Sequence, residues 1–380
     1  MLWRESNFVL GEGLVTSKTS TSSNRLDELA DWWQNLIDCA DIEDQVGLPG
    51  CGLIAFASFT FSSNSAFASK LWIAKRTTVK RGELAWQIEI EQVENKSSSV
   101  AAAESNMQGP IFQAGEQDED GFRRAVAAAV EKIRAGELSK VVLARDLVAK
   151  LPPNFSSQLA LARLHGRYPT CWNYLIGDQL GASPELLLRA ERNEISARVL
   201  AGTAARGTDP DVDMAIAEGL KTSHKNLEEH SFATESLVSQ LAPISDAVMA
   251  DTTPHSAALP DLWHLATDVS AKLKPGVSVL DVIKQIHPTA AVAGTPRGAA
   301  VQLIDQLEPF DRGGYAGPIG WLASDGSAEF ALALRGGRLE PNGQIRAFAG
   351  GGIVAESDPE SELAETELKF QAIRWAIGSQ

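Results

Sequence analysis

The sequence has few cysteines, no clustered positive charge and no long hydrophobic run. Its three cysteines, Cys39, Cys51 and Cys171, are odd in number and far apart, which argues against a disulfide framework and a CxxC metal site. The 380 residues carry 34 Lys and Arg against 49 Asp and Glu, a net charge of −15, without the basic cluster that nucleic acids require. The longest apolar stretch, around Cys51 to Phe59, is far shorter than the ~20 residues of a membrane helix. We therefore expect a cytoplasmic protein that binds neither nucleic acid nor membrane.

Several common enzyme motifs are also absent. The chain contains no P-loop, no GxSxG elbow and no HExxH helix, which removes the enzyme classes that depend on them. What is present is ordinary globular composition, with 44% hydrophobic and 22% charged residues. At roughly 150 residues per domain, the length indicates about two domains or one unusually large one.

The local patterns predict short strands, tight turns and long helices. Turn dipeptides at Asp325-Gly326 and Asn342-Gly343, each between β-rich segments, predict hairpins with type I′ turns, and Arg192-Asn193 is a weaker candidate. Small polar residues at 94–109 predict a linker or an exposed loop. Strands joined by tight turns, with long helices between them, predict an antiparallel α+β protein. The expected helices cover 25–37, 121–135, 211–241 and 359–377, and other expected strands cover 53–61, 84–93 and 141–144.

The last predicted helix carries a stripe of charged residues. Glu362, Glu365 and Lys369 are spaced i, i+3 and i+7, so they share one side of the helix. One interpretation is an exposed Glu365–Lys369 pair worth about 0.3–0.5 kcal/mol. The other is a carboxylate pair that binds a hard cation such as Mg²⁺. Glu229, in another predicted helix, is a further candidate ligand, although a solvated acidic face explains it equally well.

Lys140 and Glu185 adjoin apolar runs that would bury them. Lys140 opens the strand Val141–Ala144, and burial favours the neutral amine of a lysine, which can act as a base. The alternative interpretation of Lys140 is a side chain whose ammonium extends to water. Glu185 precedes three leucines, where a raised pKa would suit a general acid. Its alternative is an exposed charge at the edge of a strand.

Two further features suit an anionic ligand. Arg335 follows a strand, 330–334, in which Ala331 and Ala333 share its face and leave room for an anion on the guanidinium. Gly350, the first of three consecutive glycines, permits close approach of the backbone to a ligand, although a tight crossing of strands explains the glycines equally well. An ordinary hydrogen-bonded histidine, without a role in a site, explains His230 and His264 equally well.

Several short segments of the chain resemble the chorismate-utilising enzymes, both in their sequences and in their order along the chain. This family includes isochorismate, salicylate, anthranilate and aminodeoxychorismate synthases. The resemblance covers roughly residues 118–380. It implies one large domain of two packed antiparallel sheets flanked by helices, with 1–109 as a variable N-terminal part and 110–380 as the catalytic part. The matching segments are SKVVLAR at 139–145, SPELL at 183–187, LAGTA at 200–204, KNLEEH at 225–230, WHL at 263–265, HPTAAVAGTP at 287–296, FAGGGIV at 348–354 and 362–369.

The resemblance also implies a substrate and a site. The substrate is chorismate, a dicarboxylate, and the cofactor is Mg²⁺, held by Glu229 and Glu365 with Glu362 close by or acting through water. Arg335 binds the enolpyruvyl carboxylate, with Tyr315 as a second donor. The positions that line the remaining substrate pocket are Gly202, Thr203, His264, Gly350 and Lys369.

Within this family, the resemblance favours an isochorismate synthase. Water-using members have a lysine at the position of Lys140, which deprotonates water attacking C2, and Glu185 would protonate the departing C4 hydroxyl. Lyase members usually carry threonine where this chain has Ala291. We therefore expect a monomer that isomerises chorismate without a glutaminase subunit. Menaquinone, siderophore and salicylate biosynthesis all stay open as the pathway that uses the product. The alternatives are a salicylate synthase, a less favoured ammonia-using synthase, and a non-catalytic protein that binds chorismate.

Overall fold

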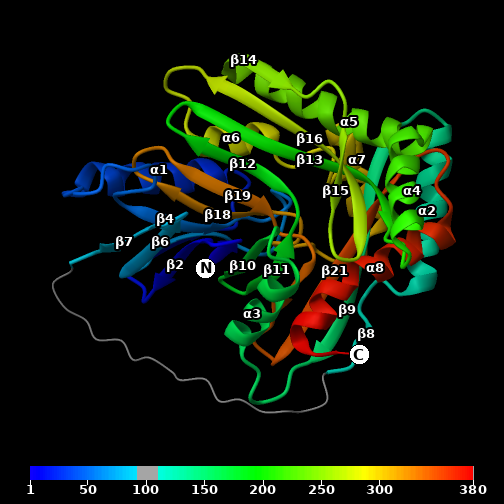
Figure 1. Ribbon diagram of the computed structural model, residues 1–380, viewed down its shortest axis with the longest axis horizontal. Helices are drawn as coiled ribbons and strands as arrows, with labels where there is room; N and C mark the ends of the chain where they lie inside the picture. The colour runs from blue at the N-terminus through cyan, green and yellow to red at the C-terminus, as the bar shows by residue number, and fades with distance from the viewer. Residues whose placement is uncertain (92–109, 380) are drawn as a thin grey trace.

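The fold consists of two large antiparallel sheets flanked by helices, as expected (Figure 1). The structure is a computed structural model and describes residues 1–91 and 110–379. The expected linker at 94–109 lies outside these residues, as does the end of the strand expected at 84–93. None of the helices in the described part of the chain combines the length and hydrophobicity needed to cross a membrane.

The larger sheet has eleven strands among the described residues. Its order is β17 (Gly294–Thr295), β9 (Lys140–Lys150), β21 (Gln344–Ile353), β20 (Gly336–Leu339), β11 (Gln179–Ser183), β10 (Trp172–Ile176), β1 (Leu2–Arg4), β2 (Asn7–Glu12), β6 (Arg76–Arg81) and β7 (Leu84–Glu89), with β8 (Gln113–Ala114) paired to β9.

The smaller sheet has ten strands in the same described residues. Its order is β14 (Ser245–Ala250), β16 (Leu262–Leu273), β13 (Glu194–Ala205), β12 (Leu186–Glu191), β19 (Ala328–Leu332), β18 (Pro318–Ala323), β4 (Ile54–Ser58), β5 (Ser69–Ile73) and β3 (Thr16–Ser20), with β15 (His255–Ala258) paired to β16.

The N-terminal residues are integral to both sheets. Strand β1 lies between β10 and β2, and β4 pairs with β18, so that Ser58 lies opposite Ile319. Each sheet therefore joins segments from both ends of the chain. The division of the chain at residue 109 into a variable and a catalytic part stays a prediction.

The helices cover the sheets on several sides. Helix α5 packs on β13 and β16, α8 on β21, α2 and α7 on β9, α3 on β10 and β11, and α1 on β3 and β5. In Figure 1, α2, α4, α5 and α8 gather at the end of the molecule opposite β2, β4, β6 and β7. The helices are α1 (Arg25–Cys39), α2 (Glu119–Arg134), α3 (Ser157–Arg167), α4 (Pro210–Thr222), α5 (His224–Leu241), α6 (Val279–Ile286), α7 (Arg297–Leu307) and α8 (Pro359–Ile377), with a 3₁₀ turn at Ala242–Ile244.

All three expected hairpins form, but the type I′ turns expected at Asp325-Gly326 and Asn342-Gly343 were wrong. The connections at 324–327 and 340–343 have four residues rather than two, and only Gly326 and Gly343 in them adopt positive φ, at 85° and 76°. A type I′ turn requires positive φ at both central residues. The expected helix at 211–241 is also interrupted, because Ser223 ends α4 and caps α5 by accepting a hydrogen bond from the Asn226 backbone.

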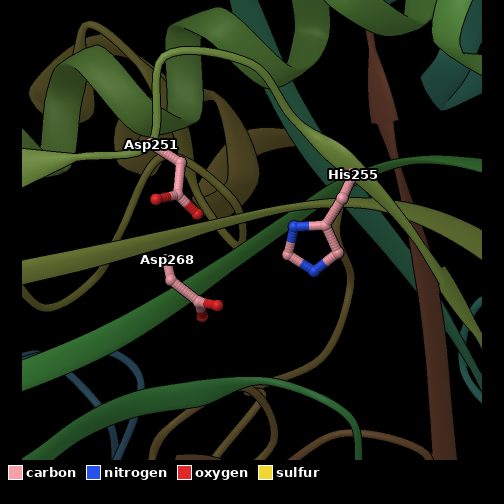
Figure 2. A group of neighbouring side chains, drawn as sticks. All are labelled: Asp251, His255 and Asp268. Atoms are coloured by element: carbon pink, nitrogen blue, oxygen red, sulfur yellow. The ribbon is translucent and has the colours of Figure 1, made fainter.

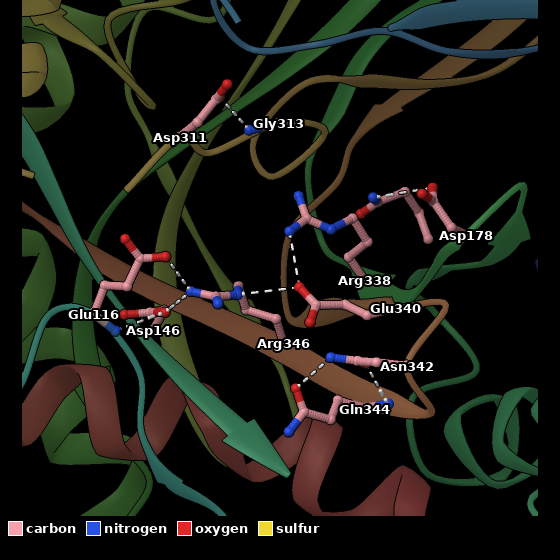
Figure 3. Close-up of polar contacts among 11 residues, drawn as sticks. Glu116, Asp146, Asp178, Asp311, Gly313, Arg338, Glu340, Asn342, Gln344 and Arg346 are labelled. Carbon is pink, nitrogen blue, oxygen red and sulfur yellow. Dashed lines mark hydrogen bonds and ion pairs between the residues drawn. The ribbon is translucent and has the colours of Figure 1, made fainter. Parts of the chain in front are cut away.

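Strands β9 and β21 pair over ten residues, from Lys150 opposite Gln344 to Val141 opposite Ile353. A cluster of polar side chains stabilises this ladder toward the end where Lys150 lies opposite Gln344. Figure 3 shows Arg346 of β21 between Asp146 of β9, at 2.5 Å, and Glu116, at 2.9 Å. Strand β20 covers the other edge of β21 only at 345–347, so the edge at Gly350–Gly352 has no strand beside it among the described residues.

Candidate active site

A cavity lies between the two sheets at this uncovered edge of β21. Its walls come from β9 and β21 of the larger sheet, β13 and β16 of the smaller sheet, and helices α5 and α8. All of the predicted site residues line it except Lys140 and Glu362. Those that do are Glu185, Gly202, Thr203, Glu229, His264, Ala291, Tyr315, Arg335, Gly350, Glu365 and Lys369.

Glu185 is a buried carboxyl in the cavity wall. It is 5% exposed and lies between β11 and β12, where its backbone N–H donates to Ser183 Oγ at 3.2 Å. Burial raises its pKa to about 8, against the opposing effect of the positive charges of Lys140 and Arg335. The alternative of an exposed strand-edge charge is therefore wrong, and the carboxyl carries a proton at neutral pH.

Lys140 lies just behind the cavity wall. Its side chain is completely buried, so the alternative that it extends to water is wrong. Its Nζ lies 3.1 Å from Oε1 of Glu229, which does line the cavity. A methyl group added at Gly352 would overlap Glu229 Oε1 and lie 2.8 Å from Lys140 Cε, so only glycine allows this pair to approach β21 so closely.

The stripe on α8 is neither fully exposed nor fully buried. Lys369 Nζ donates to Glu365 Oε1 at 2.5 Å and to the Gly350 carbonyl at 2.8 Å, which satisfies the uncovered edge of β21. Burial alone would raise the pKa of Glu365, but the charge and hydrogen bond of Lys369, together with the charges of Lys225 and Arg335, hold that pKa below its usual value. The i,i+4 pair therefore exists, and it faces the cavity.

Glu362 is the more deeply buried carboxylate, at 2% exposed, and it lies behind the cavity. It accepts hydrogen bonds from Lys225 Nζ at 2.9 Å and from Ser357 Oγ at 2.7 Å. Burial, and secondly the negative charge of Glu365, raise the pKa of Glu362. Lys225 was not among the predicted site residues.

The donor set of the three glutamates fits a hard divalent cation. Carboxylate oxygens are the ligands that Mg²⁺ prefers, and the repulsion between Glu362 and Glu365 would be relieved by a cation. Gly351 separates the two side chains from β21, because a methyl group there would lie 3.0 Å from Glu362 Oε2 and 3.5 Å from Glu365 Oε1. Each carboxylate also has its own lysine: Glu229 with Lys140, Glu362 with Lys225, and Glu365 with Lys369.

A different cluster brings three possible ligand atoms within 4.8 Å of one another. Asp251, His255 and Asp268 meet on the smaller sheet, outside the cavity (Figure 2). The glutamates of the cavity do not meet this distance condition in the described structure. All three residues of the cluster are exposed, and Arg198 already donates to both oxygens of Asp268, at 2.7 and 2.9 Å. We therefore assign no cation to it.

Arg335 is oriented by a histidine. The strand expected at 330–334 ends at Leu332, and Arg335 adopts a φ of 52°. Its Nη2 donates to His264 Nε2 at 2.9 Å, the one hydrogen bond that the described residues give this guanidinium. Because arginine can only donate, the neutral His264 carries its proton on Nδ1 and donates to Thr203 Oγ1 at 3.2 Å. Burial, and then the charge of Arg335, hold the pKa of His264 well below its usual value.

A β-bulge brings Thr203 to His264. The register of β13 and β16 shifts between Ala201 and Thr203, and Gly202 between them has a φ of 78°. Thr203 therefore lies opposite His264. His230, in contrast, is an ordinary buried histidine, bonded to the Ala201 carbonyl and to Thr267 Oγ1.

Three further residues that lie in the cavity wall or directly behind it were not predicted from the sequence. Arg312 and Phe348 line the cavity, and Glu308 pairs with Arg312 behind it. Phe348 stacks on Tyr315 with 5.1 Å between ring centroids, and burial raises the pKa of Tyr315 to about 12, so its phenol remains a donor. The segment 348–354 was matched to the family as a whole, without a role for Phe348. Glu308 and Arg312 were missed because their i,i+4 spacing is typical of an exposed ion pair.

The fold and the cavity define a chorismate-utilising enzyme, and comparison with known proteins agrees. Residues 64–378 match the family described as "Chorismate binding enzyme". The chain belongs to this family.

Several relatives are named as isochorismate synthases. The chain is 36% identical over 277 residues to the salicylate biosynthesis isochorismate synthase of Pseudomonas aeruginosa and 33% identical over 277 residues to MenF of Bacillus subtilis. These matches cover 71% and 72% of this chain, but only 57% and 59% of those relatives. It is also 33% identical to EntC of Escherichia coli K12, over 77% of this chain and 76% of the relative.

Solved structures share the whole fold. The putative 2,3-dihydroxybenzoate-specific isochorismate synthase DhbC from Bacillus anthracis has a TM-score of 0.81 and 28% identity, covering 100% of this chain and 96% of that one. Anthranilate synthase component I from Streptococcus pneumoniae has a TM-score of 0.78 at 21% identity, covering 96% and 91%, which shows the fold alone.

The raised pKa of Glu185 predicts a specific pH dependence of stability. A carboxyl whose pKa is about 8 when folded and near 4.5 when unfolded binds more protons in the folded state between these values. Stability from this group is therefore present below pH 4.5 and is lost as the pH rises to 8. Urea denaturation in EDTA should show that the wild type loses more stability than Glu185→Gln between pH 5.5 and 7.5. An equal loss in both proteins would contradict the assignment.

Proposed function

We propose that this protein is an isochorismate synthase, which isomerises chorismate by adding water at C2 and expelling the C4 hydroxyl. The observation that carries the proposal is that one cavity holds a protonated carboxyl, Glu185, together with two cationic side chains, Arg335 and Lys369, which suit a dicarboxylate. The names of the relatives support the same activity.

Arg335 is the proposed partner of the enolpyruvyl carboxylate. A guanidinium binds a carboxylate through two parallel hydrogen bonds, and His264 orients Arg335 while leaving its other donors available. Tyr315 is a second proposed donor, because its buried phenol keeps its proton. Gly202 and Thr203 are then part of the wall that positions His264, and Gly350 with Lys369 bounds the ring on the side of α8.

Glu185 and Lys140 are the proposed acid and base. Glu185 donates its proton to the departing C4 hydroxyl, since a carboxyl that is neutral near pH 7 is matched to this task. Lys140 accepts the proton of the attacking water. Because Glu229 lines the cavity and Lys140 does not, and Lys140 Nζ lies 3.1 Å from Glu229 Oε1, we propose that this proton moves through the Glu229 carboxylate.

Mg²⁺ is the proposed cofactor, held by Glu229, Glu362 and Glu365. When bound, it would supply positive charge to the ring carboxylate. The chain itself provides Lys225 and Lys369 as counterions of Glu362 and Glu365, so this part of the negative charge is balanced before any cation binds.

The reaction is proposed to stop at isochorismate. Ala291 presents a methyl group to the cavity where lyase members of the family usually have threonine. Solved relatives are titled menaquinone-specific and 2,3-dihydroxybenzoate-specific, and another relative is named for salicylate biosynthesis. Isochorismate formation is common to these names, and our proposal is confined to that step, by a cytoplasmic monomer without a glutaminase subunit.

The products formed from chorismate test this function. Purified protein incubated with chorismate and Mg²⁺ should yield isochorismate, resolved by liquid chromatography, without salicylate or pyruvate. Steady release of pyruvate would indicate a salicylate synthase instead. Binding of chorismate without any product would indicate a non-catalytic protein.

Lys140→Ala should abolish most of the turnover. Loss of a general base typically costs about 10²–10⁴-fold in rate. Lys150→Ala is a matched control, because Lys150 ends the same strand and is exposed. Initial rates measured on samples with equal folded content should separate the two variants. Near-normal turnover in Lys140→Ala would reject the proposed base.

Glu365→Gln should weaken the binding of Mg²⁺ because it removes a proposed ligand. We expect the half-saturating Mg²⁺ concentration to rise at least about tenfold, equivalent to ~1.4 kcal/mol. Binding of Mn²⁺ followed by electron paramagnetic resonance gives a readout independent of turnover. Glu360→Gln is the control, since Glu360 lies exposed on the first turn of the same helix. An unchanged titration in Glu365→Gln would count against the metal assignment.

A further inference from the structure

The cavity wall contains a buried ion pair that the proposed reaction does not use. Glu308 directly follows α7, Arg312 lies four residues later, and their side chains are 1% and 3% exposed. Arg312 Nε donates to Glu308 Oε2 at 2.8 Å, and Nη2 donates to Oε1 at 2.6 Å. The two charges are therefore matched within the wall by a two-point contact.

The remaining contacts of Arg312 join two segments of the wall. Nη2 also donates to the carbonyl of Val142 at 2.8 Å, and Nη1 donates to the carbonyl of Val292 at 2.9 Å. Val142 lies two residues after Lys140 on β9, and Val292 directly follows Ala291. This guanidinium thus reinforces the contact between the strand of the proposed base and the segment that carries the residue at the lyase position, which also meet where the Val142 N–H donates to the Ala293 carbonyl at 2.8 Å.

Glu308 adds a third connection, because its Oε1 accepts a hydrogen bond from the Ala144 N–H at 2.8 Å. Aromatic rings also contact the guanidinium. Arg312 Cζ lies 4.3 Å from the ring centroid of Phe61 and 5.7 Å from that of Tyr315. This arrangement requires the planar, forked guanidinium, since an ammonium is a point charge that cannot meet four acceptors in one plane.

We propose that Glu308 and Arg312 are positioning residues, which set the distance between Lys140 and the Ala291–Val292 wall on either side of the substrate ring. This inference rests on the proposed function, because its effect is seen in the turnover of chorismate. The proposed partners of the substrate carboxylates are Arg335 and the Mg²⁺ site, which belong to other segments. Disturbing the pair should therefore lower kcat far more than it raises KM.

Arg312→Lys tests the inference, because it keeps the positive charge and removes the fork. A misplacement of catalytic groups by about 1 Å can cost about 10²-fold in rate. We expect kcat per folded molecule to fall at least tenfold, with KM changed less than threefold. Phe61→Leu is a milder second variant that removes one ring face, and a smaller fall in kcat should follow. Circular dichroism and thermal unfolding measure the folded fraction.

Arg346→Lys is the matched control. Arg346 also pairs with a fully buried carboxylate, Asp146, but it lies at the far end of the β9–β21 ladder (Figure 3). Its kcat should equal that of the wild type. Wild-type kcat in both Arg312→Lys and Phe61→Leu, or an equal loss in Arg346→Lys, would overturn the inference. If Arg312→Lys does not fold, the kcat of Phe61→Leu decides. A wild type that forms no isochorismate would instead reject the proposed function.

Discussion

The pairing of β9 with β21 is the constraint on which the candidate site depends. This ladder places Val142 opposite Gly352 and Ala144 opposite Gly350, at an edge that β20 leaves uncovered. Side chains from α5, α8 and the start of β9 all approach the backbone at this edge, and only glycine leaves room for them. Gly351 and Gly352 are therefore explained by close approach of side chains, and Gly350 by close approach of β9, since a methyl group there would lie 2.5 Å from the Leu143 carbonyl oxygen. Approach of a ligand to this backbone stays a prediction.

Charge around the cavity is balanced in pairs. Glu229, Glu362, Glu365 and Glu308 each have a lysine or arginine partner, so the buried carboxylates need no solvent to be stable. Arg335 differs, because its partner is a neutral histidine. An overall acidic protein can thus present unneutralised positive charge at one point, and a dianionic ligand would be drawn there.

Local signals predicted local structure well. Helix α8 has the expected bounds because Asp358 caps it, Pro359 suits its first turn and Gly378 ends it with a φ of 72°. Burial of Glu185 followed from the leucines after it. The hairpin turns were mistaken because dipeptides do not reveal the length of a loop. The place of Lys140 behind Glu229, and the Glu308–Arg312 pair, depend on contacts between distant segments, which spacing along the chain does not encode.

The mixing of both chain ends within each sheet has a consequence for synthesis on the ribosome. Strand β4 can pair with β18, and β9 with β21, only after most of the chain has been made. Until then, the early strands have unsatisfied backbone edges, which are prone to pair with other chains. A nascent chain of this protein would thus depend on delayed collapse or on chaperones, and folding should be slow for its size, as for other proteins dominated by non-local contacts.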